Sequence, residues 1–378
     1  MNKLKKSIRV SDYQIIRLLG LAVVCLLVLV GYAEANTSLD LGVAGIGARP
    51  LGMGRAYVAV ADDANAVFTN PAGLGLQKNW SITSMSTQLY GNSNYVLAGA
   101  SIPVAFGTLG IGYIGLQTPA GYQVDSANSS VGAPISYNSS ELVLSYARNL
   151  KDVIKGSFLS DLSVGASVKV INNSFGGFSG SGQGTGMDLG VIFTPNNTLS
   201  LGATFSNVGG KVNWASGKQE EVEGASKFGG SLKLLGGKLL ASAGVDFAIN
   251  AQRPAILHGG IEYRPIEFLS IRGGLDQDPV NLNQTVSNLT AGVGIKMAGI
   301  SFDYAYKQDK EIETNARHYF SISLSGDGAF PFTAKKEIDK EKLAAVKDSC
   351  YSASSRSEGF ISIKNTTEKD QEILNYYK

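Results

Sequence analysis

The chain has 378 residues, of which 17% are charged, 46 are glycine and ten are proline, and its mean hydropathy is +0.04. These values exclude a disordered chain, which would carry more charge, and a helical membrane protein, which would be far more apolar. They suit many short, glycine-rich strands, and a barrel of this length can be a single domain.

Residues 1–35 have the pattern of a secretory signal peptide. A basic lead ending at Arg17 precedes an apolar core of about 13 residues, and Ala33-Glu34-Ala35 forms a small-x-small cleavage site. An anchor helix would need an apolar run of about 18 residues or more. We expect cleavage after Ala35, which removes five basic and two acidic residues and changes the formal net charge from +2 to −1. A near-neutral exported chain has no electrostatic basis for binding nucleic acid.

Residues 36–79 are rich in glycine, alanine and short polar side chains and are too long for one strand. Glycines such as Gly52 and Gly54 permit positive φ and close backbone approach. We expect a short helix over residues 56–66 and a turn at Asn70-Pro71, because the residue before a proline avoids the helical region. The lone Gly-x-Gly does not follow a strand, so it does not indicate a nucleotide-binding loop.

From Trp80 to Leu324, apolar and polar residues alternate in units of about ten residues. Read at a period of two, the pattern predicts about 14 strands. Their expected ranges are 80–89, 95–102, 107–117, 141–148, 161–172, 185–193, 199–206, 226–234, 239–247, 256–263, 268–275, 289–297, 300–306 and 317–324. The even number fits a bacterial single-chain barrel.

The expected connections also alternate in length. Those after even-numbered strands are mostly short, as at 264–267 and 298–299, and those after odd-numbered strands are mostly longer and polar, as at 118–140 and 207–225. Outer-membrane barrels have short periplasmic turns and longer extracellular loops. A soluble β-sandwich has no reason to alternate in this way. The sequence therefore predicts an all-β fold, an antiparallel transmembrane β-barrel over residues 80–325.

Charged residues within the strands are expected to face the lumen, because a charge facing lipid costs about 2–4 kcal/mol at the bilayer midplane. We expect them to form a salt-bridged polar filling or, alternatively, a solute pathway. These candidate luminal charges are Asp188, Asp246, Glu262, Arg264, Arg272, Lys296, Asp303 and Arg317.

A barrel of about 14 strands has an interior that conducts water unless something occupies it. Residues 36–79 are therefore expected to form an N-terminal hatch in the lumen. Asp62 and Asp63 would need basic partners there, and we expect Arg272 or Lys296 to supply them. The candidate hatch residues are Gly52, Gly54, Asp62, Asp63, Asn70, Pro71, Ala72 and Gly73.

The block from Gly47 to Asp63, followed by Asn70-Pro71-Ala72-Gly73-Leu74, resembles the N-terminal signature of the PorV/PorQ outer-membrane proteins, within the FadL-type fatty-acid transporter superfamily. The resemblance covers about residues 41–324. It implies a 14-stranded barrel with an N-terminal hatch, in which Asn70, Pro71 and Ala72 match an Asn-Pro-Ala motif. It also implies a place in the outer membrane of a diderm bacterium, in contact with its lipid.

The resemblance leaves two functions open. We expect a binding component of type IX-like protein secretion or surface attachment, whose partners are secreted proteins or parts of the secretion machinery. Its longer loops would then present Tyr122, Tyr137 and Trp214 as apolar anchors. The alternative is a FadL-like transporter of hydrophobic small molecules, in which a shift of residues 70–73 opens a lateral route.

Nothing in the sequence predicts an enzyme, a metal site or a cofactor. His258 and His318 have no Cys or Glu at ligand spacing, and there is no Gly-x-Ser-x-Gly elbow. Residues 326–378 are a polar tail that the resembled barrels usually lack, expected in the periplasm as an extension or a docking segment. Cys350 in this tail is expected to be a bystander or, alternatively, to pair with another chain, because Cys25 leaves with the signal peptide.

Overall fold

The computed structural model describes residues 37–38, 40–89, 92–124, 130–152, 161–176, 180–310 and 316–327. The expected signal peptide, nearly all of the expected tail and Cys350 lie outside these ranges. No helix among the described residues has the length and the apolar character needed to cross a membrane.

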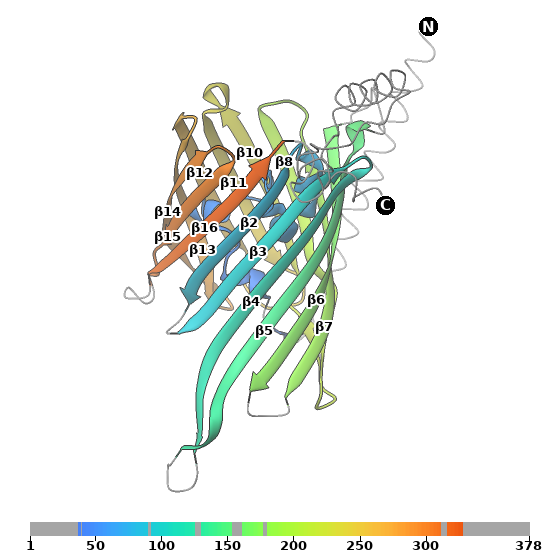
Figure 1. The fold of residues 1–378 in the computed structure, drawn as a ribbon, viewed down its shortest axis with the longest axis vertical. Helices are drawn as coiled ribbons and strands as arrows, with labels where there is room; N and C mark the ends of the chain where they lie inside the picture. The colour runs from blue at the N-terminus through green and yellow to red at the C-terminus, as the bar shows by residue number, and fades with distance from the viewer. Residues whose placement is uncertain are drawn as a thin grey trace, which may run out of the picture. The chain divides into compact units, whose positions relative to one another are not determined.

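Fourteen strands among the described residues form a closed antiparallel barrel (Figure 1). They are β2 (Trp80–Leu89), β3 (Ser93–Val104), β4 (Gly107–Val124), β5 (Ser130–Asn149), β6 (Leu162–Gly176), β7 (Ser181–Phe193), β8 (Leu199–Trp214), β10 (Ala225–Leu234), β11 (Leu239–Ala248), β12 (Ile256–Ile266), β13 (Leu269–Asn281), β14 (Gln284–Met297), β15 (Ile300–Lys307) and β16 (Arg317–Gly326). Each pairs with the next in this order, and β16 pairs with β2 to close the ring. The predicted 14-stranded all-β barrel is confirmed.

Several strands run further than the sequence pattern predicts. β4 and β5 stay paired out to Val124 and Ser130, so most of the expected loop 118–140 is a long β-hairpin, seen in Figure 1 as the arm that projects beyond the other strands. The expected loop 207–225 contains the end of β8 and a short strand, β9 (Gln219–Val222), which pairs in parallel with β1 (Thr37–Ser38). In these extensions the backbone ladder continues without the sustained apolar alternation on which the prediction depends.

The barrel is apolar outside and polar inside, which is the reverse of the arrangement in a soluble protein. Many large apolar side chains are exposed on the outer face, among them Leu144, Leu257, Leu289 and Phe302, whereas buried inward positions hold small polar residues such as Ser167. Soluble monomers rarely expose a continuous apolar surface of this extent. An apolar outer band over a polar interior is the arrangement of outer-membrane barrels.

The two ends of the barrel differ in their connections. At the short-turn end, where β2 begins and β16 ends, residues 105–106, 194–198, 235–238, 267–268 and 298–299 join the strands. At the opposite end, called here the loop end, the longer connections are 215–224, 249–255 and 308–316. By the general rule for such barrels, the short turns face the periplasm.

The lumen is occupied by residues 40–77, called here the luminal segment. It contains η1 (Leu41–Ala44), α2 (Ala48–Gly52), α3 (Ala66–Thr69) and η2 (Pro71–Leu76). Its α2 contacts β13 to β16, and its η2 contacts β4 to β7 on the other side of the barrel. Figure 1 shows this blue segment among the strands. The chain enters from the loop end, where Thr37 pairs with Glu221, and leaves at the short-turn end as β2.

The expected helix over residues 56–66 is wrong. Arg55 and Ala61 both have positive φ, which interrupts a right-handed helix, and the helical turns lie on either side of this stretch. The expected turn at Asn70-Pro71 is present. Asn70 is extended and caps η2, because its Oδ1 accepts a hydrogen bond from the Ala72 amide at 3.1 Å.

Candidate functional site

The luminal segment follows the inner wall along a row of glycines. A Cβ at Gly165 would lie 2.5 Å from the Ala72 nitrogen, and one at Gly202 would lie 2.5 Å from the Val58 oxygen. Real Cβ atoms do not approach backbone this closely, so these positions accept only glycine while the segment is in place. The wall glycines that meet the segment's backbone or Asn70 in this way are Gly165, Gly190, Gly202, Gly260 and Gly274.

Asn70, Pro71 and Ala72 lie at the centre of this contact. Asn70 is fully buried, its Nδ2 donates to the Val58 carbonyl at 2.8 Å, and its side chain faces Gly190 of β7. The hydroxyl of Ser163 in β6 donates to the Ala72 carbonyl at 2.6 Å. These contacts join one part of the luminal segment to another and to β6 and β7 of the wall.

Arg49 of α2 is the centre of a charge network on the side of the segment that faces the short-turn end. Its guanidinium lies 2.5 Å from Asp62 and 3.1 Å from Asp63 of the same segment, and 2.9 Å from Glu262 of β12. Glu262 also accepts from Arg272 at 2.7 Å, and Arg272 reaches Asp303 at 2.6 Å. Alternating charges thus run from the segment into the wall.

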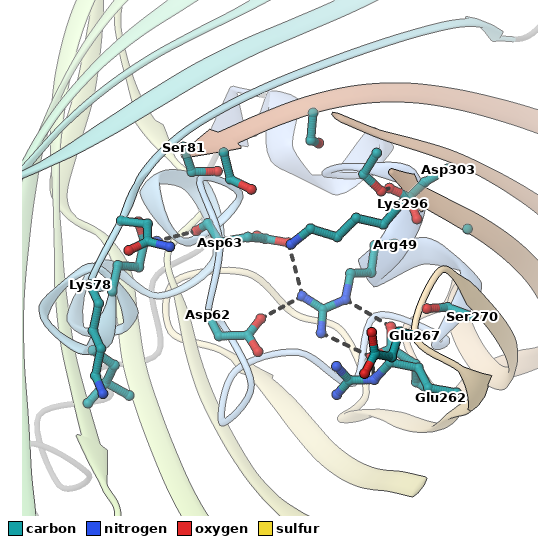
Figure 2. A pocket seen from close by; sticks show the side chains of 18 of the residues that line it. Arg49, Asp62, Asp63, Lys78, Ser81, Glu262, Glu267, Ser270, Lys296 and Asp303 are labelled. Atoms are coloured by element: carbon teal, nitrogen blue, oxygen red, sulfur yellow. Dashed lines mark hydrogen bonds and ion pairs between the residues drawn. The ribbon is translucent and has the colours of Figure 1, made fainter. Parts of the chain in front are cut away.

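This network borders a cavity of about 340 Å³, called here the short-turn cavity. Figure 2 shows Arg49 between Asp62 and Glu262, with Asp63 beside them. Besides these residues, the lining includes Arg264, Glu267, Lys296 and several serines. With charges of both signs and hydroxyl groups on its walls, the cavity suits water and small polar solutes.

Asp62 and Asp63 should protonate in a fixed order as the pH falls. Burial raises the pKa of Asp63, and the charge of Asp62 adds to that rise, so that together they outweigh Arg49. Enclosure by the barrel also opposes ionisation of Asp62, but the contact with Arg49 outweighs it and lowers the pKa of Asp62. Asp63, whose pKa is raised, therefore takes up its proton before Asp62, whose pKa is lowered. NMR of ¹³C-labelled carboxylates in detergent, assigned with D62N and D63N variants, would contradict this order if Asp62 titrated first.

A second network lies on the side of the segment that faces the loop end. Arg55 donates to Asp276 at 2.8 Å and to Asp278 at 2.9 Å, both in β13. Lys307 of β15 lies 2.5 Å from Asp276, and His258 Nδ1 lies 3.0 Å from the same carboxylate. Asp276 is completely buried, so its charge depends on these three basic partners.

A smaller cavity, called here the loop-end cavity, adjoins this network. It has a volume of about 130 Å³, and its apolar lining includes Ile46, Tyr57, Val58 and Ile256. Charged residues, among them Asp40, Lys227 and Asp246, complete its walls. The luminal segment lies between this cavity and the short-turn cavity.

The barrel wall is irregular beside the loop-end cavity. The β8–β10 ladder ends at the pair Ser206 and Ala225, the β7–β8 register shifts on either side of Met187, and Asn207 has a φ of 56°. A crevice of about 300 Å³ opens here, called the wall crevice. Its lining includes Val208, which is 38% exposed on the outer surface, and the buried residues Asn207 and Ser226.

Asn207 separates the wall crevice from the loop-end cavity. Its Nδ2 donates to Asp40 of the luminal segment at 3.1 Å and to the Glu223 carbonyl at 2.8 Å. Its Oδ1 accepts from Lys169 at 3.1 Å, and Lys169 lies 3.0 Å from Asp188 and 3.5 Å from Glu141. A movement of Asp40 would therefore be transmitted to the barrel wall by the side chain of Asn207.

The structure pairs two predicted residues differently from our expectation. Asp62 and Asp63 contact Arg49 of their own segment, because Arg272 is already held by Glu262 and Asp303. Lys296 is exposed in the lining of the short-turn cavity. The remaining luminal candidates lie on the inner side in ion pairs: Asp188 with Lys169, Asp246 with His258, Arg264 with Glu262, and Arg317 with Asp309.

The expected loop anchors lie in strands. Tyr122 is in the β4 extension and is exposed, and Tyr137 is in β5. The rings of Tyr137 and Trp214 both contact Phe175, at centroid distances of 4.9 and 6.1 Å. At least these two aromatic side chains, from β5 and β8, are thus used in packing against Phe175 of β6.

Four residues of these networks were not predicted as functional candidates: Arg49, Arg55, Asp276 and Lys307. Asp276 and Lys307 each lie one residue beyond the end of a predicted strand, at 275 and 306, and were assigned to loops. Extending the period of two by one residue would have placed both on the inner face. Among the described residues, no group of three or more His, Cys, Asp or Glu side chains could hold a metal ion.

The fold and the site define a β-barrel of the outer-membrane type whose lumen is filled by its own N-terminal segment. No protein-family model and no curated protein matches the sequence. Solved structures do match. The CymD monoaromatic hydrocarbon channel is 13% identical with a TM-score of 0.54, and the match covers 78% of this chain and 100% of CymD.

Two further structures are similar to this chain. A deltaS2 mutant of the TodX monoaromatic hydrocarbon channel is 11% identical with a TM-score of 0.50, and the match covers 75% of this chain and 99% of TodX. The toluene transporter TbuX of Ralstonia pickettii is 15% identical with a TM-score of 0.48, and the match covers 75% and 99%. At such low identities, the similarity to CymD and to the TodX mutant establishes a shared fold and nothing more.

Proposed function

We propose that this protein is an outer-membrane channel for hydrophobic small molecules, with the luminal segment as its hatch. The observation that carries the proposal is the loop-end cavity beside the wall crevice, with the side chain of Asn207 between them. One is inside the barrel, and the other reaches the outer surface at Val208. A molecule in the first is therefore one side chain away from a passage through the wall.

The chemistry of these two cavities suits a small apolar ligand. Ile46, Tyr57, Val58 and Ile256 offer apolar surface inside the barrel, and Phe205 and Val208 continue that surface in the crevice. An apolar cavity of about 150 Å³ holds benzene in another protein, which is close to the volume of the loop-end cavity. The hatch would open this route when Asp40 releases Asn207, so that the ligand leaves sideways into the bilayer.

The comparisons support the same class of function. CymD and the TodX mutant, with which this chain shares its fold, are both described as monoaromatic hydrocarbon channels. The low identity does not transfer their ligand, so the proposal names hydrophobic small molecules as a class. It also makes the outer membrane the site of action, with residues 1–35 as the cleaved signal that directs export.

The hypothesis of a role in protein secretion depends on the resemblance of residues 47–74 to the PorV/PorQ signature. It was our first expectation, and no observation in the fold or the lumen favours it. Tyr137 and Trp214, expected to anchor a protein partner, pack against Phe175. We therefore propose transport in its place.

Filling the wall crevice tests the proposal. Gly224 lines the crevice, and a Cβ there would meet its nearest atom at an ordinary 3.4 Å, so Gly224→Trp fills the space without backbone collision. We expect uptake of labelled toluene by cells that express this variant to fall to the rate of cells without the protein. The host should lack hydrocarbon channels of its own.

Gly259→Trp provides the matched control. A Cβ at Gly259 in β12 meets nothing within 4 Å, so the same substitution adds an indole outside the crevice. Uptake by this variant should equal that of the wild type. Unchanged uptake by a folded Gly224→Trp barrel would contradict the lateral route, and no uptake by the wild type would contradict transport of this ligand class.

A further inference from the structure

The luminal segment has a cavity on each of its two sides. The short-turn cavity, about 340 Å³, is lined by charges of both signs and by serines, so it suits water and ions. The loop-end cavity, about 130 Å³, lies on the other side. A path along the barrel axis from one of these cavities to the other would have to cross the luminal segment.

Tyr57 and Arg49 form the partition between them. Tyr57 lines the loop-end cavity, and its hydroxyl accepts from Arg49 at 2.8 Å and donates to Asp63 at 2.9 Å. Arg49 and Asp63 both line the short-turn cavity. The Arg49 guanidinium carbon also lies 5.4 Å from the centre of the Tyr57 ring. At this point the cavities are separated by the depth of one tyrosine side chain.

The partition is fixed from both sides. Arg49 is bound to Glu262 in the wall through two nitrogens, at 2.9 and 3.2 Å, and to Asp62 and Asp63 within the segment. Tyr57 is only 1% exposed. Paired carboxylates hold the guanidinium in one place, since separating them in a partly buried site leaves charges without partners.

We propose that Arg49 and Tyr57 form an axial seal that prevents water and ions from crossing the lumen. Arg49 closes the contact between the segment and β12, and Tyr57 closes the contact between the two cavities. With the seal in place, water and ions do not cross the barrel along its axis, even if a ligand leaves through the wall. It does not depend on the proposed transport, because it concerns polar solutes and a different pair of cavities.

Single-channel recording of the purified barrel in planar lipid bilayers tests the seal. Wild-type protein should give no steady current in potassium chloride, whereas Arg49→Ala should give a steady current, because it removes the guanidinium and releases Tyr57. Arg264→Ala is the matched control. Arg264 also lines the short-turn cavity, but its side chain is 42% exposed and its ion pair with Glu262 is long, at 3.6 Å, so this variant should stay closed.

A chemical rescue separates an open seal from a damaged barrel. In an Arg49→Cys, Cys350→Ser protein, the expected current should fall when a methanethiosulfonate reagent attaches a positively charged ammonium group at position 49. Resistance to SDS before boiling verifies that each variant is folded. Folded Arg49 variants without current, an Arg264→Ala protein that conducts as strongly as Arg49→Ala, or a current that the reagent leaves unchanged would each overturn the proposal. Toluene uptake is a separate readout, so failure of the seal and failure of transport are distinguishable.

Discussion

Replacing Gly190 by valine is expected to displace the luminal segment from the wall and to destabilise the folded barrel by about 1–3 kcal/mol, the usual cost of overpacking. The added side chain would collide with the Asn70 carboxamide, and its Cβ would lie 3.1 Å from the Ala72 nitrogen. Neither Asn70 nor Ala72 has room to retreat, because both are completely buried. Trypsin should then cut after Arg55, which is followed by Ala56 and which the barrel encloses in the wild type.

Gly273→Val is the control for this variant. A Cβ at Gly273 meets nothing within 4 Å, so the same side chain is added without a collision. Its segment should stay protected from trypsin, and its urea midpoint should equal that of the wild type. A Gly190→Val protein with wild-type protection would show that the segment does not rest on the wall in the way described.

Changing Asp276 to asparagine is expected to destabilise the barrel by about 3–5 kcal/mol, the cost of breaking a buried ion pair by removing one partner. The substitution keeps the shape but leaves Arg55 and Lys307 with Asp278 as their remaining close carboxylate partner. Urea unfolding followed by the fluorescence of Trp80 and Trp214 measures the change.

The exposed pair of Lys218 and Glu220 provides the comparison for this charge change. Lys218 is 55% exposed, and such surface pairs contribute about 0–1 kcal/mol. Glu220→Gln should therefore leave the unfolding curve almost unchanged. Equal effects of the two substitutions would contradict a structural role for the Asp276 network.

The barrel could be predicted because lipid-facing strands need apolar residues at every second position, and this alternation is visible in the sequence. β2 has its predicted bounds, and β10 and β11 differ from theirs by one residue. The extensions of β4 and β5 lack a sustained apolar alternation, so they were predicted as a loop. β1 and β9 are too short to show any period.

The lumen was predictable in composition but not in pairing. A period of two places Glu262, Arg272 and Asp303 on the inner face, but it does not say which residues of the luminal segment lie opposite them. Arg49 took the contacts with Asp62 and Asp63 because the positive φ values at Arg55 and Ala61 bend the segment back on itself. Such a fold depends on tertiary contacts with the wall glycines, which have no local signal.

Some expectations remain predictions. They include cleavage after Ala35, the periplasmic tail over residues 326–378 and the role of Cys350. N-terminal sequencing of the mature protein from outer-membrane fractions would test the first, and a chain that begins before Asn36 would contradict it.

Native mass spectrometry of the gently extracted barrel tests the central claim, transport of hydrophobic small molecules, most directly. We expect barrels that carry small hydrophobic molecules, which are lost on mild activation and are fewer in Gly224→Trp than in Gly259→Trp. A barrel without such molecules, or one that copurifies with protein partners instead, would contradict it.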